Sequence, residues 1–383
     1  MTASALGLSV GATNLAAVTA DHAVTRKPVL TLYRRHPAEV GVPSENPRLD
    51  QPGVVITDFV NRVGDPVGIE AADGSVHGSA DVTADALRAV SYAATGAHAL
   101  PDNVAVAYPA HWASAAIDAL GAALVRVTEW SDREHPLTLI PDAAATLLAA
   151  QADPGIPSPG TVAVCDFGGS GTNITLMDAA GDYHPVAATL RHRDFSGDLI
   201  DQALLTVVMA NLPSTGPFDP AGTLAIGALR RLRTGCRHVK ERLSSSAVDT
   251  LSDGLPAAIG DVGVTRDELD DAIRDSLNQF VAVLDKTLEH NGIRDLVAVV
   301  AAGGGANVPV IITTLSRHFR VPVITTPRPQ LAAAIGAALR AARDLGDESE
   351  SVLTAAEPVP ATALVAADDS EPRPRRRRGE HRA

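Results

Sequence analysis

The chain has 383 residues, of which 45 % are apolar and 20 % charged, and its net charge is −13. At about 100 to 200 residues per domain this length can build two or three cores, and because aromatic residues make up only 3 % of the chain, aliphatic side chains must fill them. The acidic balance argues against a general nucleic-acid binder, and two cysteines, Cys165 and Cys236, cannot form a disulfide framework or a four-ligand zinc site.

The regular elements expected along the chain alternate between strand and helix over residues 1–345, which predicts an α/β fold. Strands are expected at 4–9, 15–20, 53–57, 103–107, 161–166, 173–178, 296–301 and 321–324. Helices are expected at 84–96, 113–125, 143–152, 198–211, 223–243, 266–291 and 329–344. The helix from 266 has the clearest signals, because Thr265 and Glu268 form a capping-box pattern and Gly292 ends it.

No export or membrane segment is expected. The start, MTASALGLSV, lacks the basic residues and the long apolar run of a secretory signal. The most apolar window, 296–315, is interrupted by three glycines, Asn307 and Pro309, which argues against a transmembrane segment. The chain is therefore expected to be cytoplasmic.

The composition changes after Gly346, where proline, serine and acidic residues replace the apolar runs. This predicts a disordered tail over 347–383. The tail ends in a basic cluster formed by Arg373, Arg375, Arg376, Arg377 and Arg378. The cluster either keeps the chain soluble or makes a weak contact with an anionic membrane surface, with nucleic acid or with an acidic partner. The acidic residues before it weaken any such contact.

One strand–turn–strand pattern occurs twice. Residues 6–19, LGLSVGATNLAAVT, and residues 162–177, VAVCDFGGSGTNITLM, each read as an apolar strand, a glycine turn, Thr-Asn and a second apolar strand. Two copies of one unit predict a duplicated fold whose halves face each other across a cleft.

Three glycine turns carry the candidate chemistry, at 11–14, 168–172 and 303–305. Glycine lets backbone N–H groups approach an anion closely, so such turns can cradle a polyphosphate without a Walker lysine. Asp166, at the end of an apolar strand before the second turn, is placed to hold Mg²⁺ through water. The alternative is that all three are ordinary tight turns and that Asp166 only initiates one.

Seven segments resemble one known family, and they occur in the family's order between residue 6 and about residue 343. VGATN at 10–14 and DFGGSGTNITLM at 166–177 are similar to its two phosphate loops, and RRLRTGCRHVKERLSSS at 230–246 to its adenosine-site helix. The others are AYPAHW at 107–112, IPDAAATLLAA at 140–150, AAGGGANVPVI at 301–311 and PQLAAAIGAAL at 329–339. Together they resemble the nucleotide-binding domain of the heat shock protein 70 (DnaK-type) chaperones.

The resemblance implies an actin-like ATPase fold of two lobes, 1–158 with a trimmed small subdomain and 159–346, with ATP or ADP and Mg²⁺ between them. It implies Asp166 and Asp142 as the catalytic residues, and Asp166 as the residue that holds the metal through water. The residues that it implies for nucleotide binding are Gly11, Thr13, Gly168, Gly169, Gly197, Lys240, Ser244, Gly303 and Gly304.

Several family positions differ in this chain. Ser9 stands where the family has its first-strand aspartate, Asp142 where it has a glutamate, and Asn173 where it has an aspartate. No lysine lies between residues 28 and 239, so the family's first-lobe lysine has no counterpart. Phosphoryl transfer depends on neutralising developing charge, so these losses predict slow or absent hydrolysis.

The leading hypothesis is an ATP-binding, chaperone-like protein that acts as a nucleotide-dependent switch on an unknown protein partner, with weak hydrolysis at most. No peptide-binding domain is expected after residue 345, since the family's apolar linker is not found there. The first alternative is a pseudo-ATPase that binds no nucleotide and serves as an interaction scaffold. A sugar or acetate kinase of the same superfamily ranks lower, with Asp142 and Asp198 as its candidate catalytic carboxylates.

Overall fold

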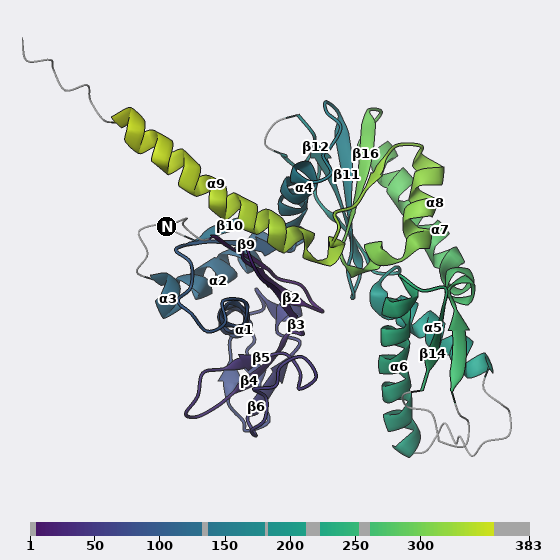
Figure 1. Cartoon of the computed structure of the whole chain (residues 1–383), viewed down its shortest axis with the longest axis horizontal. Coiled ribbons are helices and arrows are strands. Elements are labelled where there is room, and N and C mark those ends of the chain that lie inside the picture. Colours follow the sequence, from purple (N-terminus) through teal and green to yellow (C-terminus); the bar gives the residue numbers. More distant parts are fainter. Residues whose placement is uncertain (1–4, 132–136, 181–182, 212–222, 253–260, 356–383) are drawn as a thin grey trace, which may run out of the picture. The chain divides into compact units, whose positions relative to one another are not determined.

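The computed structural model describes residues 5–131, 137–180, 183–211, 223–252 and 261–355 (Figure 1). The chain divides into two compact units, Met1–Leu345 and Gly346–Ala383. The arginine cluster of the tail lies outside the described residues, so its predicted contact is untested.

The first unit is a mixed α/β structure with two five-stranded sheets. The first sheet has the order β10-β9-β1-β2-β3. Its strands are β1 (Ala5–Ser9), β2 (Leu15–Val18), β3 (Ala23–Arg26), β9 (Asn103–Tyr108) and β10 (Thr138–Pro141). The neighbours of β9 run parallel to it, whereas β1, β2 and β3 form an antiparallel meander.

The second sheet repeats this topology with the order β13-β12-β11-β16-β17. Its strands are β11 (Thr161–Phe167), β12 (Thr172–Asp178), β13 (Leu190–His192), β16 (Leu296–Ala302) and β17 (Val323–Ile324). Here too the two neighbours of one strand, β11 and β17 beside β16, are parallel to it, and β11, β12 and β13 form an antiparallel meander. The β1–β2 and β11–β12 hairpins therefore occupy equivalent places, which confirms the duplication predicted from the repeated pattern.

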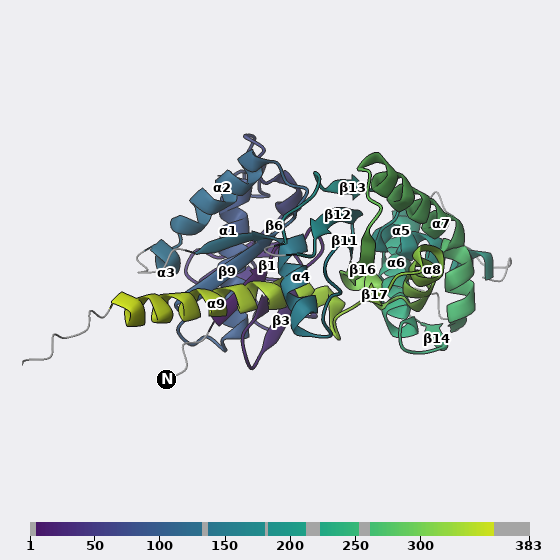
Figure 2. The same ribbon diagram turned by 90° about the horizontal axis from the view of Figure 1, so that it is seen from above.

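Helices cover both faces of the first sheet. α1 (Ser79–Ala94) and α2 (Ser114–Val125) bury leucine and valine side chains against β1 and β9, and the short α3 (Thr128–Ser131) follows α2. On the other face, α4 (Asp142–Ala152) and the first turns of α9 (Ala332–Ala355) pack on alanines of β9. These two helices lie side by side (Figure 2), so close that a Cβ on Gly336 would lie 1.7 Å from the carbonyl oxygen of Ala145.

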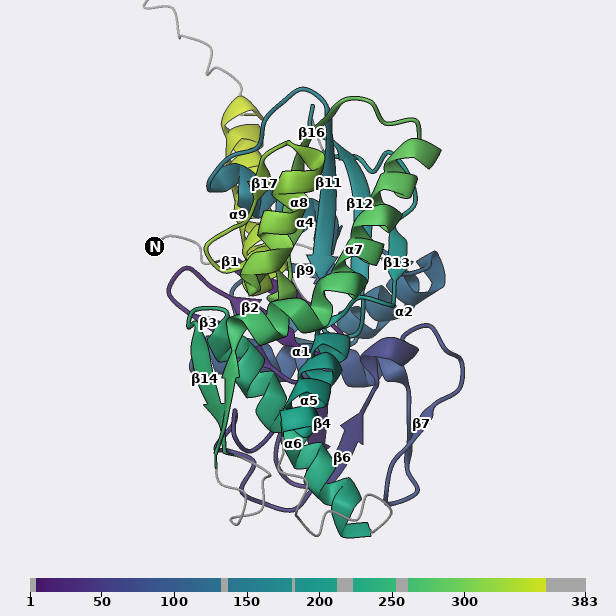
Figure 3. The ribbon, with the colours of Figure 1, turned by 90° about the vertical axis from the view of Figure 1, so that its right-hand side faces the viewer.

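The second sheet shares α4 with the first. Leu147 of α4 packs on one face, against valines of β11 and β16. α7 (Arg266–His290) and α8 (Pro309–Phe319) cover the other face (Figure 3). In the core beneath them, the rings of Phe280 and Phe167 are in contact, with 5.1 Å between their centroids. The same core continues into α5 (Gly197–Asn211) and α6 (Thr223–Leu243). Each of these two sheets, with the helices that pack on it, is called a half of the unit below. Because α4 packs on both sheets, it couples the two halves.

Three smaller sheets and three short 3₁₀ helices complete the described part of the chain. The sheets are β5-β4-β6, β7-β8 and β14-β15. Their strands are β4 (Val29–Leu32), β5 (Glu39–Val40), β6 (Val54–Thr57), β7 (Ile69–Glu70), β8 (Val76–His77), β14 (Val248–Leu251) and β15 (Val262–Thr265). The 3₁₀ helices are η1 (Val60–Arg62), η2 (Gly304–Asn307) and η3 (Pro329–Leu331).

The expected elements are present, with shifts at their ends. The capping box at the start of α7 is confirmed, because Thr265 Oγ1 accepts from the Glu268 N–H and the Glu268 carboxylate accepts from the Thr265 N–H. Helix α8, which begins at Pro309, was not predicted. Helix α9 continues to Ala355, past the expected end at 344, and so includes the first residues of the segment predicted to be disordered. Among the described helices, none has the length and apolar character needed to span a membrane.

Candidate functional site

The turns of the two equivalent hairpins meet. A Cβ placed on Gly169, in the β11–β12 turn, would lie 2.3 Å from Cγ2 of Thr13, in the β1–β2 turn. Only glycine allows this approach, because any side chain at position 169 would overlap the threonine. Gly11 is needed within the β1–β2 turn itself, because an added Cβ there would lie 2.8 Å from the carbonyl oxygen of Asn14. Two predicted phosphate loops from opposite halves thus lie in contact.

The second loop is held by the start of α5. The Gly197 N–H donates to the carbonyl of Gly168 at 3.0 Å, and the Asp198 N–H donates to the carbonyl of Gly169 at 2.8 Å. Within the loop, the Gly168 N–H donates to the carbonyl of Gly171 at 3.1 Å. These bonds fix the loop and occupy two N–H groups of the first turn of α5.

Lys240, near the end of α6, reaches the same place. Its Nζ lies 2.6 Å from Oδ1 of Asp201 and donates to the carbonyl of Gly197 at 3.1 Å. Both side chains are largely buried, with 11 % of Lys240 and 3 % of Asp201 exposed. Ser244, just beyond α6, donates instead to the carbonyl of Glu241 at 2.6 Å, a contact within its own helix end. Of the two residues predicted to contact the adenosine, only Lys240 has a hydrogen bond to the segment that holds the second loop.

Sequence reasoning missed Asp201, although a signal was present. Asp201 falls on the apolar stripe of α5, with Leu204 and Val208 one and two turns further on. A carboxylate on a buried stripe needs a partner, and that partner here is Lys240.

The third glycine turn approaches Asp166. Gly303 has a φ of +78°, and a Cβ there would lie 2.3 Å from Oδ1 of Asp166 and 2.6 Å from the carbonyl oxygen of Phe167. Gly303 therefore needs both the positive φ and the missing side chain. At Gly304 no atom lies within 4 Å of an added Cβ, so open space borders this turn.

Asp142 and Asp166 influence each other electrostatically. Asp142 begins α4, and its Oδ1 accepts from the Ala110 N–H at 3.0 Å. Each residue keeps some exposed surface, but burial of the carboxyl group, and after it the charge of Asp166, raises the pKa of Asp142 to about 8. Burial likewise raises the pKa of Asp166, against the charge of Arg191. At neutral pH the pair therefore favours holding a proton.

This pair suits a cation that is held mainly by other oxygens. Within the described ranges, no three histidine, cysteine or acidic side chains come together as a metal site. Mg²⁺ is commonly held by one or two carboxylates, by water and by substrate phosphates. Asp166, with Asp142 beside it, fits that arrangement, because a nearby cation would favour the charged form of both carboxyls.

A cavity of about 570 Å³ lies beside the second loop and was not predicted. Ser170, Arg191 and Arg193 line it from the second half of the unit. Its other lining residues, all from the first half, are Asn61, Val63, Gly64, His111, Trp112, Ala113, Ala115 and Ala116. Arg191 donates to Asn173 Oδ1 at 3.0 Å and to Ser170 Oγ at 2.8 Å. The sequence did not reveal this arrangement, because the short strand β13 that carries Arg191 was not predicted.

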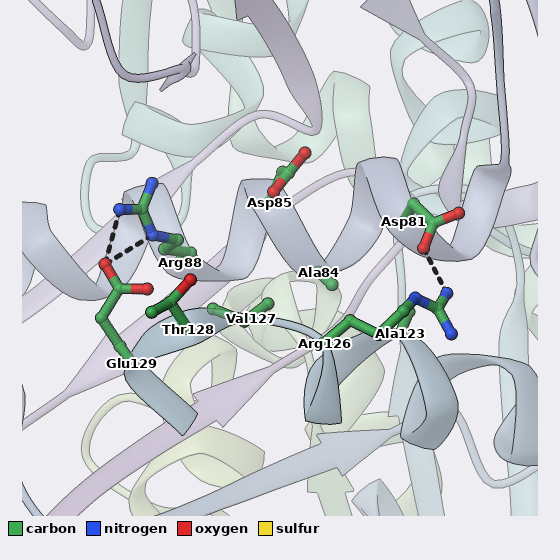
Figure 4. A pocket seen from close by; sticks show the side chains of 9 residues that line it. All are labelled: Asp81, Ala84, Asp85, Arg88, Ala123, Arg126, Val127, Thr128 and Glu129. Atoms are coloured by element: carbon green, nitrogen blue, oxygen red, sulfur yellow. Dashed lines mark hydrogen bonds and ion pairs between the residues drawn. The ribbon is translucent and has the colours of Figure 1, made fainter. Parts of the chain in front are cut away.

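A second cavity, of about 400 Å³, lies between α1 and the α2–α3 segment (Figure 4). Its arginines are paired with carboxylates: Arg88 Nε donates to Glu129 at 2.7 Å, and Arg126 pairs with Asp81. None of the predicted site residues lines it. These two pairs connect α1 to the segment that follows α2, so the polar groups of this cavity have a structural role.

Comparisons with known proteins show which family the chain resembles. The family described as "Hsp70 protein" matches residues 141–363, more than half of the chain. The chain is 28 % identical over 220 residues to a heat shock cognate HSP70 protein of Trypanosoma brucei brucei, which covers 55 % of this chain and 32 % of that protein. It is 26 % identical over 297 residues to a chaperone protein HscA homolog of Tolumonas auensis, covering 77 % of this chain and 45 % of that protein. The chain thus spans a third to a half of the length of these curated relatives.

Proposed function

Since the chain belongs to the Hsp70 protein family, we propose that it binds ATP or ADP between its two halves and acts as a nucleotide-dependent switch that hydrolyses ATP slowly or not at all. The family brings an actin-like ATPase fold, in agreement with the two equivalent sheets and their flanking helices. Members of the family bind ATP and ADP with Mg²⁺.

One observation carries the proposal: the two equivalent glycine turns face each other, with Thr13 against Gly169. A polyphosphate that takes hydrogen bonds from both turns would hold the two halves together, and its loss would release them. Asp166 and Asp142 would hold Mg²⁺ through water, and the ion would supply positive charge against the phosphates. Lys240 and Gly304 border the side where the adenosine is proposed to lie.

Slow hydrolysis follows from the charges that are missing. Ser9 leaves one carboxylate fewer near the metal than the family pattern has, and no lysine between residues 28 and 239 can approach the terminal phosphate from the first half. Each such group typically contributes orders of magnitude to phosphoryl transfer. A steady-state turnover equal to that of ordinary chaperones of this family would contradict the proposal.

Calorimetric titration with ATP, with and without Mg²⁺, tests nucleotide binding. We expect affinity in the micromolar range that Asp166→Ala abolishes and that Asp275→Ala, an exposed acidic position on α7, leaves unchanged. X-ray scattering with and without ATP then tests the switch, because closure of the halves would reduce the radius of gyration. Identical scattering curves at saturating ATP would count against the switch.

The alternative is a scaffold that has kept the fold and lost the nucleotide. One contact favours it: Lys240 is already engaged by Asp201. Titration of well-folded protein that releases no heat with ATP or ADP would support this alternative. The protein partner would then be sought on the outer surface rather than through its preference for one nucleotide state.

A further inference from the structure

The cavity beside the second loop has a positive lining. Two arginines and a histidine line it, and no aspartate or glutamate does. Within the described part of the chain, neither Arg191 nor Arg193 has a carboxylate within ion-pair distance. The cavity between α1 and the α2–α3 segment shows the opposite pattern, since its arginines pair with Asp81 and Glu129 (Figure 4). The charges of Asp166 and Asp142 also act on Arg191, but neither carboxylate lines the cavity. Arginines that converge on one cavity with no carboxylate in contact indicate an anion site.

Arg191 is held in place for such a ligand. Its Nη1 and Nη2 each donate one hydrogen bond to a neutral side chain, Asn173 and Ser170. The guanidinium lies over Gly171, where a Cβ would approach its Cζ to 2.8 Å. An arginine has five N–H donors, so donors remain after these two bonds. The group is therefore oriented before any ligand arrives, which lowers the entropic cost of binding.

The charges of Arg191 and Arg193 both act on His111, a third residue of the cavity lining. Burial, followed by the charges of Arg191 and Arg193, lowers the pKa of His111 to about 4. Its buried Nδ1 has no hydrogen-bond partner among the described residues. A neutral imidazole can present one N–H donor to an anion.

The lining residues from the first half add two further features that suit an organic anion. Ala113, Ala115 and Ala116 belong to the start of α2, which has no side-chain cap and no acidic residue in its first turn. A helix N-terminus of this kind favours a negatively charged group next to it, because the helix dipole is positive at this end. Trp112 and Val63 provide an apolar surface next to it, and about 300 to 1,000 Å³ is the usual size of a small-molecule site.

We propose that this cavity is a binding site for a small phosphorylated organic anion, with Arg191, Arg193 and His111 contacting the phosphate and Trp112 the organic part. The site goes beyond the proposed nucleotide function and does not require it. Since Ser170 belongs to the second glycine turn and lines the cavity, the new ligand would bind next to the proposed nucleotide phosphates and join the two halves there.

The test titrates the chain with inorganic phosphate and with phenyl phosphate at constant ionic strength, set with potassium chloride. We expect saturable binding of both, with phenyl phosphate tighter because its ring contacts Trp112, and Trp112→Ala should remove that difference. Arg193→Ala should weaken both roughly tenfold or more, as for loss of a charge-assisted hydrogen bond. Arg193 is exposed, so this variant should fold. Arg126→Ala, in the other cavity, is the matched control.

The titration is repeated with a saturating non-hydrolysable ATP analogue, whose terminal phosphate fills the position that ADP would leave empty, to separate this site from the nucleotide site. We expect the affinity for phenyl phosphate to survive, and it should also survive if the chain binds no nucleotide at all. The proposal is overturned if neither probe saturates, if phenyl phosphate binds no tighter than phosphate, or if Arg126→Ala weakens binding as much as Arg193→Ala. It is equally overturned if the ATP analogue abolishes binding, because the phosphate would then occupy the nucleotide site.

Discussion

Replacing Lys240 by methionine removes the closer of the two cations that pair with Asp201, the other being Arg237. The carboxylate lies 2.6 Å from Nζ and its side chain is only 3 % exposed. Water cannot take over the role of the lysine at such a position. The cation that remains, Arg237, has its Nε 3.9 Å from the other carboxylate oxygen and compensates the buried charge only in part. We expect Lys240→Met to lower the free energy of unfolding by about 3 to 5 kcal/mol, the usual cost of removing one partner of a buried ion pair.

An exposed pair of the same kind provides the control. Arg274 and Asp271 on α7 also form an ion pair, with side chains 63 % and 64 % exposed. Solvent screens such pairs, which contribute about 0 to 1 kcal/mol. Arg274→Ala should therefore change stability little, and the contrast between the two variants depends on burial rather than on the charges alone.

The assay is unfolding in urea, followed by circular dichroism. The double variant Asp201→Leu, Lys240→Met should regain most of the lost stability, because apolar residues can replace a buried pair at little cost. If Lys240→Met is no more destabilising than Arg274→Ala, the reasoning is wrong. Calorimetry of the restored double variant with ATP then shows whether Lys240 also contacts the nucleotide, separately from its structural role.

Three further predictions concern pH and helix capping. Because the pKa of Asp142 rises from 3.8 to about 8 on folding, the native state keeps a proton that the unfolded chain releases. The free energy of unfolding should therefore fall as pH rises through this range. In urea titrations at several pH values, Asp142→Asn should reduce that fall and leave the part due to the raised pKa of Asp166. A hydrogen bond from Arg88 is the main reason why the pKa of Glu129 is lowered from 4.5 to about 2 on folding. The stability that the ionised Glu129 contributes above its unfolded pKa of 4.5 should therefore be lost as the pH falls toward its folded pKa of about 2. In an acid titration, Arg88→Ala should lose less stability over this range than the unchanged protein. Thr265→Ala removes the cap of α7 and should cost about 1 kcal/mol, measured by the shift of the urea midpoint, whereas an unchanged midpoint would mean that the capping box contributes nothing.

Local signals in the sequence were sufficient for much of the fold. The capping box at Thr265, the apolar stripe of α7 and the apolar strands β11 and β16 each depend on neighbours a few residues away, and each was predicted. The repeated strand–turn–strand pattern also predicted that two equivalent hairpins exist. Elements with weak local patterns were missed, such as β13, with only three residues, and α8, whose first residue is Pro309.

The sequence by itself determined which residues form the three glycine turns and that Asp166 ends a buried strand. Only the tertiary structure decided which of them meet. Thr13 touches Gly169 because two sheets bring equivalent turns together, and Gly303 reaches Asp166 because β16 lies parallel to β11. Lys240 finds Asp201 on another helix, and Arg191 faces a cavity whose other wall is the start of α2. These contacts join residues far apart in the chain, so their geometry depends on packing, which no local pattern of residues records.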